Sequence, residues 1–167
     1  MRSAAFSPAR NVGGQGGRQG PIDFAAADGL NGRELWTTGG TARGTDLLAE
    51  LWPGGGPGNP TSPVRLGAGH VLVAGTEPQP GSEPWITDGT AAGTHRILDI
   101  NAAESGFSGS SPSNSTPLGD GRALFVASDP IHGSGAWVTD ATADGTHLLG
   151  NIFPGATGSG AQGFLLL

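Results

Sequence analysis

The chain has 167 residues, of which 13% are charged, and its formal net charge is −6. Gly and Pro make up about 27% of the residues, a share that indicates either closely spaced turns or low complexity. It contains no Cys, which excludes disulfides, thiolate zinc sites and Cys nucleophiles and leaves the redox compartment open. Its eight scattered bases are all Arg and no run of 18 apolar residues occurs, so we expect neither a nucleic-acid partner nor a membrane span.

The first 20 residues are polar and rich in Gly, and they lack the apolar stretch of a secretory signal peptide. We therefore expect residues 1–20 to form a flexible N-terminal segment, with no signal peptide visible in this chain. The region that we predict to be folded covers residues 21–167.

Three segments of this region align on a Trp and read ELWTTGGTARGT, EPWITDGTAAGT and GAWVTDATADGT. Six of the twelve columns are identical in all three. The identical residues are Trp36, Trp85 and Trp137; Thr38, Thr87 and Thr139; Thr41, Thr90 and Thr142; Ala42, Ala91 and Ala143; Gly44, Gly93 and Gly145; and Thr45, Thr94 and Thr146. Since the Trp residues are 49 and 52 residues apart, the sequence repeats with a period of about fifty.

We predict four short β-strands in each repeat unit, with the middle unit as the example. Residues 64–66 and 70–75 form one hairpin around a Gly-bearing turn, and residues 84–87 and 95–100 form a second hairpin. No window shows a sustained helical period. The repeat units span about 21–60, 61–112 and 113–155, and an orphan first strand follows at 163–167. Trp85 and Trp137 are three residues further apart than Trp36 and Trp85, and we place these three extra residues in the Ser-rich stretch 105–116.

The strand that carries the Trp is apolar on both faces. Trp85 points to one face, while its neighbours Pro84 and Ile86 point to the other. Sheets of about fifty residues that their neighbours cover on both sides are typical of β-propeller blades. We therefore predict an all-β fold, a β-propeller-like array of about three four-stranded blades, with a β-solenoid as the alternative.

These segments resemble the ELWxxDGT repeat (Glu-Leu-Trp-x-x-Asp-Gly-Thr), a tandem motif of myxobacterial and other bacterial proteins that are usually large and secreted or surface-located. The resemblance covers about residues 22–167. It implies a propeller-like fold and an extracellular or cell-surface location, and it carries over no catalytic residue. The chain departs from the motif at Gly39, where the first copy lacks the Asp, at Pro84 in the second copy, and at Gly135 and Ala136 in the third.

The order of the strands also indicates how the chain assembles. The first unit begins at its second strand, residues 22–26, and the chain stops after a segment that matches a first strand. We expect either that two copies complete a six-bladed ring head to tail, or that the chain continues into further repeats of a longer protein.

The repeated acids Asp88 and Asp140 stand where a strand enters a loop. We expect their carboxylates to accept backbone N–H groups in the turn, with Gly44, Gly93 and Gly145 supplying a positive φ. The alternative is a Ca²⁺ site that uses Asp88 and Asp140, although the chain has no dense D-x-D-x-D-G loop. We otherwise expect no cofactor.

Aromatic and imidazole side chains supply the remaining candidates. The three aligned Trp are expected to anchor packing between blades, and Trp52 is a candidate for a surface contact or for further packing. His95 and His147 occupy the same column as Asp46. These three could converge on a metal ion or a ligand, or could be solvated residues at the start of a strand.

Two functions remain open at this point. The favoured one is a non-enzymatic interaction module that binds a protein or a glycan through loops repeated on each blade. The alternative is a fragment of a propeller hydrolase or lyase that acts on polysaccharide, which rests on analogy between folds alone.

Overall fold

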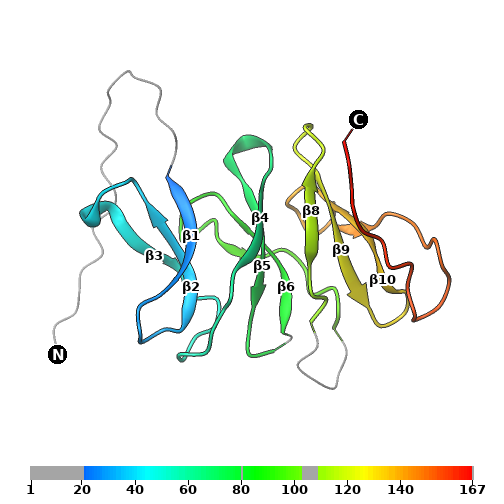
Figure 1. Ribbon diagram of the computed structural model, residues 1–167, viewed down its shortest axis with the longest axis horizontal. Helices are drawn as coiled ribbons and strands as arrows, with labels where there is room; N and C mark the ends of the chain where they lie inside the picture. Colours follow the sequence, from blue (N-terminus) through cyan, green and yellow to red (C-terminus); the bar gives the residue numbers. More distant parts are fainter. Residues whose placement is uncertain (1–20, 80, 103–108, 167) are drawn as a thin grey trace.

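The fold consists of antiparallel β-sheets, as the sequence predicts. A computed structural model describes residues 21–79, 81–102 and 109–166, and within these ranges the only helical elements are short 3₁₀ turns at Ala42–Gly44 and Gly67–Gly69. Three separate sheets stand side by side along the long axis of the molecule (Figure 1). The all-β prediction is confirmed, and the three sheets do not close into a ring.

Sheet 1 has three strands in the order β1-β2-β3. They are β1 (Ile22–Ala27), β2 (Arg33–Thr38) and β3 (Thr45–Ala49). Phe24 in β1 lies opposite Trp36 in β2. The sheet thus contains the Trp strand and its two neighbours.

Sheets 2 and 3 have four strands each, in chain order across the sheet. Sheet 2 contains β4 (Thr61–Arg65), β5 (Val71–Thr76), β6 (Ser82–Thr87) and β7 (His95–Arg96). Sheet 3 contains β8 (Ser113–Pro117), β9 (Ala123–Asp129), β10 (Gly133–Thr139) and β11 (His147–Leu148). Val73 pairs with Trp85 and Phe125 pairs with Trp137, so the register repeats the pairing in sheet 1.

The fourth strand is shorter than the predicted segment 95–100. After β7 only one further ladder bond forms, from the N–H of Ile97 to the carbonyl of Pro84. The chain then leaves the sheet, and the N–H of Ile100 donates to the Glu83 carboxylate. The fourth strand of sheet 3, β11, is equally short.

The Ser-rich stretch is partly ordered β-structure. Residues 103–108 lie outside the described ranges, whereas β8 begins at Ser113 and ends at Pro117. The bonds of Glu34 and Glu83 to the following linkers place the three extra residues between Ile100 and Ser110. The prediction that residues 1–20 form a flexible segment falls outside the described residues.

The core lies between the sheets. Leu72 and Ile86 of sheet 2 pack with Phe125 and Trp137 of sheet 3. Leu51, from the linker after sheet 1, packs with Val73 and Trp85 of sheet 2. Each of these Trp residues therefore faces the sheet that precedes its own.

Trp36 and Ile152 depart from this pattern. Trp36 is only half-buried and donates from Nε1 to the carbonyl of Ala26 at 3.0 Å. Ile152, which aligns with buried Leu51 and Ile100, is 73% exposed. Both residues belong to the outer flanks of the three-sheet array.

Candidate functional site

The loop after the Trp strand is a rigid polar turn. In sheet 2, Oδ1 of Asp88 accepts from the N–H of Thr90 at 2.9 Å and from its hydroxyl at 2.6 Å. The Thr90 hydroxyl oxygen in turn accepts from the N–H of Gly93 at 3.0 Å. Hydroxyls of Thr87 and Thr94 lie 2.7 Å apart and close the base of the loop. Each polar side chain of the motif is thus engaged in holding the turn.

Sheet 3 reproduces this turn and sheet 1 reproduces part of it. Asp140 makes the same two bonds to Thr142, at 2.9 and 2.6 Å. In sheet 1 the Asp is replaced by Gly39, whose N–H instead donates to the carbonyl of Gly44. The paired Thr hydroxyls persist in all three sheets at 2.7 Å.

The expected positive φ at Gly44, Gly93 and Gly145 is wrong. None of the three lies in the left-handed region. Gly93 is needed for space, because a Cβ there would overlap the carboxylate of Asp88, and Gly145 stands in the same relation to Asp140. A Cβ on Gly44 would meet only the Thr41 hydroxyl, at 3.1 Å.

The positive φ belongs to another position of the loop. Gly40 and Gly89 both have φ of 83°, and Ala141, at the same place in sheet 3, has φ of 76°. A left-handed conformation is unfavourable for a residue with a Cβ. The departure of the third copy from the Asp-Gly-Thr motif therefore introduces local strain.

The bonds within the turn lower the pKa values of its carboxyls. The hydroxyl of Thr90, followed by its N–H, holds the pKa of Asp88 below its ordinary value. Thr142 lowers the pKa of Asp140 in the same way. Both carboxylates are exposed, and hydrogen bonds to the ionised form favour that form.

Sheets 1 and 2 each contain a buried glutamate that sequence analysis did not single out. Each glutamate binds the linker that follows its own sheet. Glu34 is fully buried and accepts from the N–H groups of Leu51 at 2.6 Å and Gly58 at 2.8 Å. Glu83 is also fully buried and accepts from Ile100 at 3.1 Å and from the N–H and hydroxyl of Ser110 at 2.8 and 2.6 Å. Burial raises the pKa of Glu83, and the bonds from Ser110 oppose that rise.

The signal for these glutamates is present in the sequence. Each stands two residues before its Trp, and the third copy has Gly135 at that place. There a Cβ would meet the end of the Leu148 side chain at 2.7 Å, so a larger residue would require that side chain to shift. The following linker is held by main chain instead, with the N–H of Ser159 donating to the carbonyl of Ser134 at 2.7 Å.

The predicted binding residues lie at equivalent places on the outer strands of different sheets. Asp46 pairs with Thr37, His95 with Ile86 and His147 with Val138, and all three side chains are exposed. In residues 21–79, 81–102 and 109–166 no group of three or more His, Asp or Glu side chains is placed to hold a metal ion. Trp52 is half-buried against Gly56, whose Cβ would overlap the indole.

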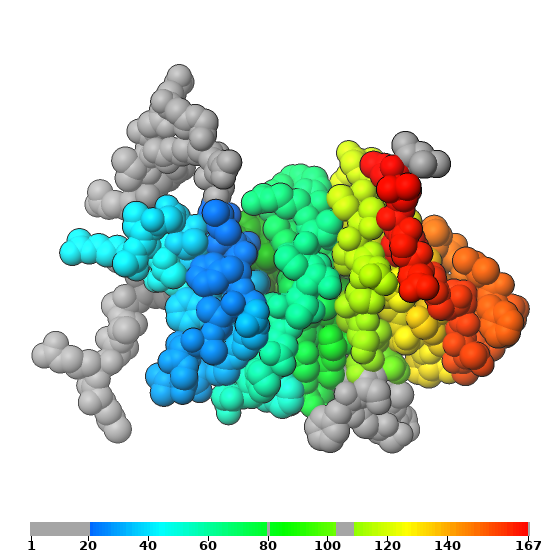
Figure 2. Space-filling view, in the orientation of Figure 1, coloured from blue at the N-terminus to red at the C-terminus, as the bar shows by residue number. Residues whose placement is uncertain are grey.

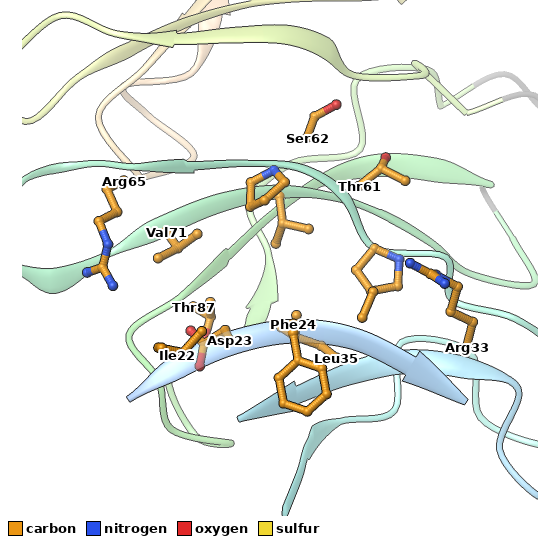
Figure 3. A pocket seen from close by; sticks show the side chains of 14 residues that line it. Ile22, Asp23, Phe24, Arg33, Leu35, Thr61, Ser62, Arg65, Val71 and Thr87 are labelled. Carbon is orange, nitrogen blue, oxygen red and sulfur yellow. The ribbon is translucent and has the colours of Figure 1, made fainter. Parts of the chain in front are cut away.

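A groove of about 660 Å³ separates sheet 1 from sheet 2. Figure 3 shows β1 and β4 running along its sides, with Arg33 and Arg65 toward opposite ends. Leu35 and Val73 contribute apolar lining, and Oδ1 of Asp23 is buried there with no hydrogen-bond partner. The groove is thus elongated, and its sides are strand edges.

A second hollow, of about 650 Å³, lies between the first-hairpin turns of sheets 2 and 3. His70, Arg122 and Asp140 line it together with turn glycines. Asp120 is paired with Arg122 at 2.6 Å, and both side chains are about half-exposed. This hollow is an open surface between loops.

No match was found when the chain was compared with models of protein families, with curated proteins and with solved structures. Among the described residues there is no helix that is long and apolar enough to cross a membrane.

Proposed function

We propose that the chain is a β-propeller-like repeat module of the ELWxxDGT type that works by binding and not by catalysis. Its ligand would be a protein or a glycan at the cell surface or outside the cell. The observation that carries this proposal is the turn after each Trp strand, because the same polar frame holds the loop in sheets 2 and 3 and most of it recurs in sheet 1.

The tips of these loops differ while their frames agree. The residues seven positions after the Trp are Arg43, Ala92 and Asp144, and all three are exposed. A frame that fixes the backbone and leaves the tip free presents tips of different chemistry at equivalent places, which one extended partner contacts together. Multivalent binding of this kind raises the overall affinity without strong single contacts.

The acids of the repeats support binding more than catalysis. The carboxylates of Asp88 and Asp140 hold their own turns, and those of Glu34 and Glu83 hold the linkers. A general acid or base needs a carboxyl that is free to reach a substrate. Acids that are fixed in repeated structural bonds are poorly suited to that role.

A glycan array probed with the purified chain, with and without Ca²⁺, tests the proposal, and each bound glycan is then assayed for turnover. We expect binding without turnover. Changing Arg43, Ala92 and Asp144 together to Ser should lower binding at least tenfold while the melting temperature stays within about 2 °C. Turnover that is lost when one acid is substituted would overturn the proposal in favour of a polysaccharide-degrading enzyme.

A further inference from the structure

The C-terminal residues repeat the backbone of the first strands of sheets 2 and 3. Before β4 and within it, positive φ occurs at two non-Gly residues three positions apart, and the same spacing recurs at β8 and at the C-terminal segment. The pairs are Asn59 and Ser62 (φ 42° and 53°), Ser111 and Asn114 (53° and 51°), and Gly160 and Gly163 (58° and 70°).

One hydrogen bond fixes the alignment of these three segments. The N–H of Asn59 donates to the carbonyl of Arg33, that of Ser111 to Ser82, and that of Gly160 to Ser134, at 2.9, 3.0 and 3.3 Å. All three acceptors stand three residues before the Trp of their sheet. Residues 162–166 therefore correspond to Thr61–Arg65 and to Ser113–Pro117, which are β4 and β8.

Among the residues that the structure describes, this segment has no strand partner of the kind that β4 and β8 have. β4 pairs with β5 and β8 pairs with β9, whereas residues 162–166 belong to no sheet. Figure 2 shows the segment, in red, beside sheet 3 on the face that also carries β1 and β4. Leu165 and Leu166 are 80% and 60% exposed, which is unusual for two adjacent Leu.

β1 has the opposite deficiency. It corresponds to β5 and β9, the second strands, but within the described part of the chain it pairs only with β2. Its other edge borders the groove between sheets 1 and 2. An extended segment would bring N–H groups into that groove, where the buried Oδ1 of Asp23 lacks a donor.

The two outer faces of the array, one on sheet 1 and one on sheet 3, both expose apolar side chains. Phe24 and Trp36 are half-exposed on sheet 1, although their counterparts in sheet 3, Phe125 and Trp137, are buried against the preceding sheet. On the other flank Leu149, Ile152 and Phe153 are more than half exposed near sheet 3. A second copy that placed its sheet 1 beside this flank would cover both groups.

We propose that residues 162–166 of one copy add as the missing first strand to β1 of a second copy. The inference rests on the proposed repeat module and names its partner as the chain itself. In sheets 2 and 3 the pairs are Thr61 with Ala74 and Ser113 with Val126. By the same count Gln162 lies opposite Ala25, and Leu166 lies opposite Ile22.

The partner is a second copy because of where the two elements lie. Figure 1 shows β1 and the C-terminal segment separated by sheets 2 and 3. One chain therefore cannot make the pairing with itself while its sheets stay packed. Reciprocal exchange of the strand by two copies gives a closed assembly of six four-stranded sheets.

Cysteine pairs test this register directly, since the chain contains no Cys. Opposed residues of antiparallel strands have Cα atoms about 4.5–5.5 Å apart, within the range of about 4.4–6.8 Å that a disulfide needs. Ala25→Cys and Gln162→Cys, made in separate chains and mixed under oxidation, should form a mixed dimer. Ala161→Cys, which moves the thiol to the other face of the segment, is the matched control and should react at least fivefold less.

Sedimentation of the unmodified chain gives the second measurement. We expect a dimer whose dissociation lowers the melting temperature as the protein is diluted. Leu165→Asp with Leu166→Asp should give a folded monomer with unchanged far-ultraviolet circular dichroism. A monomer in the unmodified chain without the mixed disulfide would overturn the inference.

Two further results would also contradict it. By the repeat count Val12 aligns with Thr61. If Val12→Cys and Ala25→Cys in one chain formed an intrachain disulfide and the mixed dimer did not form, the strand beside β1 would come from the chain's own N-terminal residues. Species that grow beyond the dimer with concentration would replace the closed pair with an open filament. Glycan binding by a monomer would leave the proposed function standing while the self-association failed.

Discussion

The carboxylate of Asp88 fills the space beside Gly93 in which a Cβ on residue 93 would lie. Gly145 and Asp140 repeat the relationship in sheet 3. In sheet 1 the Asp is absent. A methyl group on the corresponding Gly44 would have one tight contact, with the Thr41 hydroxyl. The motif Gly is therefore tied to the motif Asp.

Replacing this Gly by Ala should destabilise sheet 2 much more than sheet 1. Gly93→Ala forces the Asp88 carboxylate out of its bonds with Thr90, and we expect it to lower the free energy of unfolding by about 1–3 kcal/mol. Gly44→Ala should change it by less than about 1 kcal/mol. Urea unfolding of both variants checks the difference.

A double variant isolates the cause. Asp88→Gly recreates in sheet 2 the arrangement that Gly39 gives sheet 1. In that background Gly93→Ala should lose most of its effect, giving a coupling energy of about 1 kcal/mol or more. Equal effects of Gly93→Ala in both backgrounds would refute the shared-space explanation.

Ala141 offers a stabilising substitution. Its φ of 76° is unfavourable for Ala, and Gly occupies the equivalent place in the other two sheets. Ala141→Gly should therefore stabilise the chain by about 0.5–1 kcal/mol, since the relief of about 1–2 kcal/mol exceeds the added entropy of Gly in the unfolded chain. Ala143→Gly, at a neighbouring loop position without positive φ, is the control and should destabilise slightly; differential scanning calorimetry distinguishes the two.

The buried Glu83 should be sensitive to an isosteric change. Both of its carboxylate oxygens accept hydrogen bonds, so the amide of Glu83→Gln would point donor hydrogens at a donor. We expect a loss of about 1–3 kcal/mol in the free energy of unfolding at pH 7. Exposed Glu50→Gln is the matched control and should have little effect.

The raised pKa of Glu83 gives this substitution a pH signature. The unfolded chain releases the proton near the ordinary value of 4.5, and the folded chain releases it at higher pH. The stability contributed by the protonated folded form is thus present below about pH 4.5 and lost as the pH rises through the folded pKa. Melting curves from pH 4 to 7 should show this decline in the unmodified chain and a flatter profile in Glu83→Gln.

Asp140 should act with the opposite sign. Because Thr142 lowers its pKa from the ordinary 3.8, the ionised form stabilises the fold above that value, and the contribution disappears as the pH falls through the lower folded pKa. Asp140→Asn should therefore be less stable than the unmodified chain at pH 6, and the difference should narrow as the pH falls from 6 to 3 and below. Asp144→Asn, an exposed change of the same kind nearby, should leave the melting temperature unchanged at both pH values.

Phe125 and Phe24 test the packing between sheets, since they share one place in the repeat. Phe125 is fully buried between sheets 2 and 3, and Phe125→Ala should cost about 3–5 kcal/mol. Phe24 is half-buried on the flank of sheet 1. Phe24→Ala should therefore cost less in the monomeric Leu165→Asp, Leu166→Asp background than Phe125→Ala does there, as measured by urea unfolding.

The repeat made most of the strands predictable. The columns around Trp85 fix a register that recurs at every copy, and strands six residues long carry enough apolar positions for a pattern to show. The ends of the fourth strands were harder, since β3 runs from Thr45 to Ala49 whereas β7 and β11 have two residues each at the same place in the repeat. The bond from Ile100 to Glu83 joins residues 17 positions apart, which local pattern does not reveal either.

The polar frame of the loops was predictable only in part. Thr and Asp at a turn indicate hydrogen bonds to the turn backbone. The role of Gly93 was misjudged, because Gly at a loop end suggests positive φ and the need for space depends on where a distant carboxylate lies. Glu34 and Glu83 could not be assigned from the sequence, because their N–H donors lie 17 to 27 residues further along the chain.

The two glutamates make neighbouring sheets depend on each other during unfolding. Sheet 1 keeps Glu34 satisfied only while the linker to sheet 2 is in place, and sheet 2 depends in the same way on the linker to sheet 3. Opening one of these junctions leaves buried carboxyl oxygens without their hydrogen-bond donors, so the first two sheets should exchange their amide hydrogens together. In the described ranges the third sheet has no carboxylate at its exit, where the N–H and hydroxyl of Ser159 donate to the carbonyl of Ser134, and this is where the array should begin to fray.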